Sequence, residues 1–182
     1  MTATTPTIYY VIGALVIIVV VIATIVLSRQ AQSARLRRRF GPEYDRLTRD
    51  RGDRADAERE LARREERVKG FKLQDLPAGA RDRYTEEWRQ VQSRFVDEPG
   101  AALAQSDALI RSVMRDRGYP PAGFEQRVAD LSPDHARAID DYRVAHEISE
   151  RSDADTEDRR EAMIRYRRLF DDLVGTTERT RT

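Results

Sequence analysis

The sequence predicts an all-α protein with one N-terminal transmembrane helix, a charged helical stalk and a small bundle of four to five short helices. Three observations support this fold class: a long uncharged apolar run, a densely charged segment after it, and apolar stripes of helical period with no alternating strand pattern. They divide the chain into a short polar tail (1–7), a transmembrane helix (8–28), a basic juxtamembrane segment and charged stalk (29–69), a bundle domain (70–175) and a disordered tail (176–182).

The apolar run extends from Ile8 to Leu27 and contains no charged residue. As a helix it would span about 30 Å, which matches the hydrocarbon core of a bilayer. The preceding residues, MTATTPT, contain no Lys or Arg, and the run is longer than the apolar core of a secretory signal. We therefore expect a retained membrane anchor and not a cleaved signal peptide.

Five arginines follow the apolar run, and no basic residue precedes it: Arg29, Arg35, Arg37, Arg38 and Arg39. Because basic residues in short flanks stay in the cytoplasm, this asymmetry predicts a single-pass protein of the cell membrane with its N-terminus outside and its C-terminal domain inside. The same arginines are expected to contact anionic headgroups of the bilayer, and a specific lipid site is an alternative to topology control alone. Nucleic acid is not an expected partner, because no aromatic residues interleave the arginines.

The segment from 43 to 68 is almost entirely charged, and its opposite charges recur at helical spacing. Gly41 and Pro42 should end the preceding helix and begin a new one. A sparse apolar stripe crosses the segment, and Arg54 interrupts it. We expect a solvated helical stalk, with weak self-association through the stripe as the alternative; the stripe consists of Leu47, Leu61 and Val68.

Residues 70–175 have the composition of a globular domain. The clearest helical signal is a stripe in which the apolar residues are spaced by four, three and four positions, namely Tyr84, Trp88, Val91 and Phe95. Similar faces recur in four further segments up to Gly175, which is expected to follow the last helix. The region therefore predicts a helical bundle around one modest core.

Several blocks of the sequence resemble an uncharacterised family of bacterial proteins that carry an N-terminal membrane anchor and a helical domain. These blocks are RRFGPEYDR, RYTEEWRQVQSRFVDEP, VMRDRGYP, FEQRVADLSPDH and YRRLFDDLV, in this order. The resemblance covers most of the chain after the apolar run. It implies an anchored helical protein but no activity, and it assigns no functional residue.

The chemistry-bearing residue types argue against catalysis. The chain has no cysteine, which excludes disulfides, thiolate metal sites and cysteine nucleophiles. His135 and His146 are the only histidines, and on one helix they would lie about 16 Å apart, too far for one metal ion. No phosphate-binding loop, dinucleotide fingerprint or nucleophile elbow is present. We expect no catalytic, metal or cofactor-binding residue, no cofactor and no enzymatic activity.

One loop stands out as a candidate contact with a protein partner. The stretch RGYPPAGFEQR contains two prolines, which stiffen it, and it carries Tyr119 and Phe124 beside arginines. These two aromatic residues are the candidates for a partner contact. The pattern favours the other interpretation, a simple connection between helices whose aromatic rings pack inward.

Together these features favour a membrane-anchored, non-enzymatic interaction or scaffold protein at the cytoplasmic face of a bacterial membrane, with an unknown protein partner. The basic residues are almost all arginine, which is typical of a high-GC bacterial genome. An extracytoplasmic structural protein of the envelope is the main alternative, and a membrane-tethered nucleic-acid-binding module is a further one.

Overall fold

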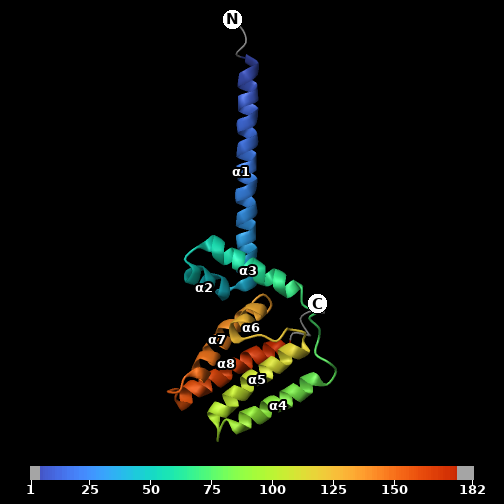
Figure 1. The fold of residues 1–182 in the computed structure, drawn as a ribbon, viewed down its shortest axis with the longest axis vertical. Coiled ribbons are helices and arrows are strands. Elements are labelled where there is room, and N and C mark those ends of the chain that lie inside the picture. Colours follow the sequence, from blue (N-terminus) through green and yellow to red (C-terminus); the bar gives the residue numbers. More distant parts are fainter. Residues whose placement is uncertain (1–4, 176–182) are drawn as a thin grey trace.

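The computed structural model describes residues 5–175, and all regular secondary structure in that range is α-helical, which confirms the predicted fold class (Figure 1). The expected tail at 176–182 and residues 1–4 of the expected N-terminal tail lie outside the described residues. The helices are α1 (Thr5–Phe40), α2 (Pro42–Arg51), α3 (Arg54–Lys69), α4 (Ala80–Arg94), α5 (Pro99–Asp116), α6 (Phe124–Leu131), α7 (Ala136–Glu150) and α8 (Thr156–Gly175).

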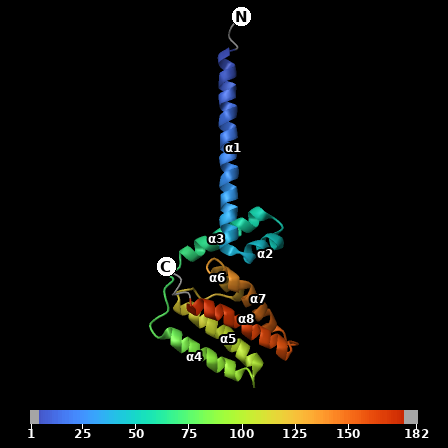
Figure 2. The same ribbon diagram turned by 180° about the vertical axis from the view of Figure 1, so that it is seen from behind.

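Helix α1 projects away from the rest of the molecule as a single straight rod, as two opposite views show (Figures 1 and 2). It is long and apolar enough to span a membrane. Its apolar side chains are exposed all round, from Leu15, with 61% exposure, to Leu27, with 65%. No described part of the chain covers this surface. A helix that is apolar on every side needs an apolar environment, which a bilayer would supply.

The chain turns sharply at the end of α1, as Gly41 and Pro42 predict. Gly41 has a positive φ of 48°, and Pro42 opens α2. A second turn follows at Gly52, which also has a positive φ, of 68°. The carboxylate of Asp53 then accepts the backbone N–H of Ala55 at 3.0 Å and caps α3. These turns fold α2 and α3 back across the end of α1.

The charged segment is helical as expected, but it does not form an extended stalk. Leu47 and Leu61 of the predicted stripe are buried within the chain, because the last turns of α1 supply apolar partners that the stripe itself lacks. We call α2, α3 and residues 33–40 of α1 the collar. Its small core consists of Leu36, Phe40, Tyr44, Leu47, Ala57 and Leu61.

Helices α4 to α8 form the predicted bundle below the collar (Figure 1). Helix α8 packs against both α5 and α7, and α4 packs on α5. The stripe on α4 faces the core, as predicted: Trp88 is completely buried, and its ring stacks on Phe170 with 4.7 Å between ring centroids. Phe95, at the end of the stripe, is only partly buried.

Candidate functional site: an ion-paired collar at the base of α1

The collar holds α1 through a half-buried carboxylate as well as through its apolar core. Glu58 of α3 accepts hydrogen bonds from the hydroxyl of Ser33 at 2.6 Å, the phenol of Tyr44 at 2.7 Å and Nε of Arg54 at 2.9 Å. Burial acts to raise the pKa of Glu58, but these three hydrogen bonds outweigh it and hold the pKa below its ordinary value. One ionised side chain thus joins α1, α2 and α3.

A second carboxylate, Glu65 of α3, receives two of the arginines that follow the apolar run. Arg35 donates to it at 2.8 Å and Arg39 at 3.1 Å, and the carboxylate is only 4% exposed. The hydrogen bond from Arg35 is the main cause that lowers the pKa of Glu65, although partial burial opposes it. These two arginines therefore pair with a buried carboxylate of the collar although their own side chains stay exposed, in addition to any role at the membrane.

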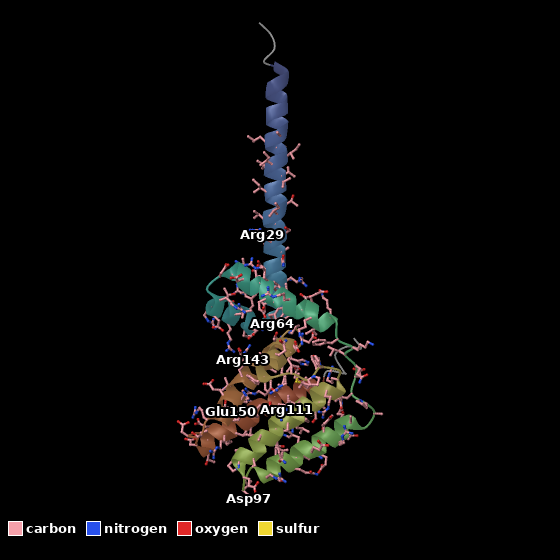
Figure 3. The ribbon with its side chains drawn as sticks, in the orientation of Figure 1. Arg29, Arg64, Asp97, Arg111, Arg143 and Glu150 are labelled. Carbon is pink, nitrogen blue, oxygen red and sulfur yellow. The ribbon has the colours of Figure 1, made fainter. Side chains whose placement is uncertain are left out.

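A third carboxylate, Glu43 of α2, connects the collar to the bundle. It is 1% exposed, and its Oε1 accepts Nη1 of Arg64 at 2.8 Å and Nη2 of Arg143 at 2.7 Å. Arg64 belongs to α3 and Arg143 to α7, and Figure 3 labels both where the collar meets the bundle. Separating the collar from the bundle would break the pair between Glu43 and Arg143 and leave a buried charge without its partner. The pair therefore holds the collar and the bundle together.

Two further arginines make polar contacts across the same junction. Arg67 of α3 donates to the carboxylate of Asp130 in α6 at 2.8 Å, and Asp130 is 1% exposed. Arg39 of α1 donates to Asp134 at 3.0 Å and to the backbone carbonyl of Pro133 at 3.2 Å. The collar is thus attached to α6, to α7 and to the turn between them by directional, charge-assisted bonds.

The five arginines predicted from the sequence separate into two groups. Arg35 and Arg39 bind Glu65, and Arg37 pairs with Asp45 at 3.3 Å. Arg29 and Arg38 are exposed and have no ion pair with any described side chain. Of the five, Arg29 and Arg38 are therefore the two that no carboxylate of the described residues engages in competition with lipid headgroups.

Tyr119, one of the two candidate contact residues, is not exposed. Its side chain is 4% exposed and belongs to the bundle core, where its ring meets Phe71 edge-on, and burial raises its pKa above the ordinary value. Phe124 is half-buried, and its ring stacks on His146 with 3.6 Å between centroids. The interpretation of inward-packed aromatics therefore describes Tyr119.

The two histidines lie in different surroundings. His135 is 2% exposed, and its Nδ1 lies 2.7 Å from a carboxylate oxygen of Asp172. His146 packs on Phe124 instead. In the part of the chain that the structure describes, no cluster of three or more His, Cys, Asp or Glu residues could hold a metal ion.

The burial of Glu43, Glu65 and Asp130 was not predictable from the sequence, because carboxylates are mostly exposed and this chain contains many. One available signal was the pair Leu36 and Phe40. These residues lie four positions apart among the arginines, so they share one face at the end of α1. This small apolar face should be buried by packing against another segment of the chain.

Comparison with known proteins adds nothing to this geometry. No protein-family model, curated protein or solved structure matches the chain.

Proposed function

We propose that this protein is a membrane-anchored, non-enzymatic scaffold that holds a helical bundle in a fixed orientation at the cytoplasmic face of a bacterial membrane. The observation that carries the proposal is the continuity of α1. The helix runs without a break from its exposed apolar part into the collar core, where Leu36 and Phe40 are completely buried. An anchor joined in this way transmits its orientation to the bundle, whereas a flexible linker would not.

The position of the collar supports a role close to the lipid surface. Its first buried contact is Ser33, six residues beyond Leu27 and therefore about 9 Å further along the helix axis. A headgroup layer is roughly 5–7 Å thick on each side of the hydrocarbon core. In the proposed arrangement the collar lies directly beneath the headgroups, and Arg29 lies within them. The bundle is then presented near the membrane and is not held far from it.

A scaffold role also suits the side chains that could otherwise carry chemistry. The chain offers no thiol, and its histidines are engaged separately, His135 with Asp172 and His146 with Phe124. The ion pairs that cross the junction, of which those of Glu43 are the most buried, fix geometry and do not create a reactive group. We therefore propose binding without catalysis, and a protein partner that contacts the exposed surface of the bundle.

Reporter fusions test the proposed orientation. A reporter active only in the cytoplasm should work when fused after the C-terminal residue, and a reporter active only outside the cytoplasm should not. The physical reason is the excess of arginine on the C-terminal side of the apolar run. The opposite pattern would refute the cytoplasmic scaffold and would favour the extracytoplasmic structural protein.

A further inference from the structure

A cavity of about 340 Å³ lies in the bundle, between α5 and the segment from 119 to 122. Its volume falls at the lower end of the range for small-molecule sites, which is about 300–1,000 Å³. One part of the lining is apolar, and three arginines form the other part. The apolar part includes Met114, Tyr119, Pro120 and Pro121, and the arginines are Arg111, Arg115 and Arg127.

Arg127 forms a fixed cationic part of this lining. It is 7% exposed, and its guanidinium donates to the phenol of Tyr142 at 2.9 Å, to the carbonyl of Ala122 at 3.1 Å and to the carboxylate of Asp107 at 3.3 Å. Asp107 also accepts the Tyr142 phenol at 2.8 Å and pairs with Arg111 at 3.0 Å. Two of the three arginines are thus held in place by one shared carboxylate.

Arg115 differs from the other two because it has no carboxylate partner among the described side chains. It is exposed, and its one polar contact within residues 5–175 is a hydrogen bond from Nη2 to the hydroxyl of Ser112 at 3.2 Å. Three arginines against the single Asp107 leave two positive charges around the cavity. An anion can therefore bind here without displacing an existing ion pair.

We propose that this cavity binds a small organic anion that has an apolar body. The oxyanion group binds Arg115 and Arg111, because guanidinium groups present paired N–H donors that match carboxylate geometry. The apolar body contacts Met114 and the two prolines. The proline pair stiffens the rim, which lowers the entropy lost when a ligand orders it. This site is separate from the collar and does not depend on the proposed orientation in the membrane.

The test uses the intact protein in detergent micelles and 4-(trifluoromethyl)benzoate as the probe, with binding followed by ¹⁹F NMR and empty micelles as the background. Two variants address the cavity in different ways. Arg115→Ala removes the unpaired charge, and Ala108→Leu adds volume to the lining and leaves the charge unchanged. Arg51→Ala is the matched control, because Arg51 is an exposed arginine of α2 without an ion pair among the described residues. Circular dichroism confirms that each variant is folded.

We expect Arg115→Ala to weaken binding of the probe about tenfold, as suits the loss of one charge-assisted bond. Ala108→Leu should weaken it as well, and Arg51→Ala should leave it unchanged. The uncharged analogue 4-(trifluoromethyl)benzyl alcohol should bind more weakly and should not respond to Arg115→Ala. Equal losses in Arg115→Ala and Arg51→Ala, unchanged binding in Arg115→Ala, or equal binding of the uncharged analogue would each overturn the proposal.

Discussion

The replacement Glu43→Gln isolates the contribution of charge to the collar–bundle junction. Both Arg64 and Arg143 donate to the same oxygen, Oε1, and Oε2 has no hydrogen-bond partner. A glutamine whose carbonyl takes the place of Oε1 keeps both hydrogen bonds, removes the negative charge and places an amide NH2 at the unpartnered position of Oε2. The arginine donors stay charged, but each bond loses its ionised acceptor at a cost of about 1 kcal/mol, so the cost for the two bonds is about 2 kcal/mol. That cost corresponds to an approximately 30-fold change in the opening equilibrium of the collar.

Amide hydrogen exchange of the intact protein in micelles, read by mass spectrometry, measures this opening. Peptides from α2 and α3 should exchange about 30-fold faster in Glu43→Gln, while peptides from α5 and α8 should not change, because the bundle core lies elsewhere. Asp56→Asn is the matched control: Asp56 pairs with Arg59 on the exposed face of α3, so its loss should change exchange by less than about twofold. Equal acceleration in both variants, or none in Glu43→Gln, would refute the reasoning.

Three further predictions concern the bundle and the collar. In urea unfolding followed by Trp fluorescence, Tyr119→Ala should lower the free energy of unfolding by about 3 kcal/mol, and Tyr119→Phe should lower it by less than about 1 kcal/mol. If both variants lower it by less than about 1 kcal/mol, Tyr119 is not a core residue. Trp88→Ala should cost about 3–5 kcal/mol in the same assay read by circular dichroism, and native Trp emission at the wavelength of exposed indole would contradict its burial. Because the folded collar lowers the pKa of Glu65, its stabilising effect should be complete above the ordinary value near 4.5 and should decline as the pH falls below it. Thermal unfolding between pH 5 and pH 3 should therefore show a smaller decline in Glu65→Gln, and an equal decline would exclude this contribution.

Local signals in the sequence were sufficient for most of the helices. Stripes such as Tyr84, Trp88 and Val91 repeat at the helical period and turn out to be buried, because each one is wide enough to require a core on its own. The break at Gly41 and Pro42 was predictable for a similar reason, since these residue types restrict the backbone whatever surrounds them. Local chemistry therefore determines where the helices begin and end.

The collar could not be predicted in the same way, because its core is assembled from three separate segments. The stripe with Leu47 and Leu61 appears too sparse to bury until Leu36 and Phe40 of α1 are placed against it. The burial of Glu43 depends on Arg143, which lies one hundred positions further along the chain. Nothing local to either residue indicates that pairing. The same holds for Tyr119, whose burial depends on how the loop closes over the bundle.

If α1, the collar and the bundle form one rigid unit, a position on α1 and a position in the bundle keep a fixed distance, and an electron-spin distance measurement tests this directly. The chain has no cysteine, so spin labels introduced through Gln30→Cys on α1 and Asp97→Cys between α4 and α5 would be the only ones present, and both positions are exposed. In lipid nanodiscs we expect a single narrow distribution of distances between the two labels. A broad distribution, typical of a flexible connection between the anchor and the bundle, would contradict the rigid collar and the scaffold role that depends on it.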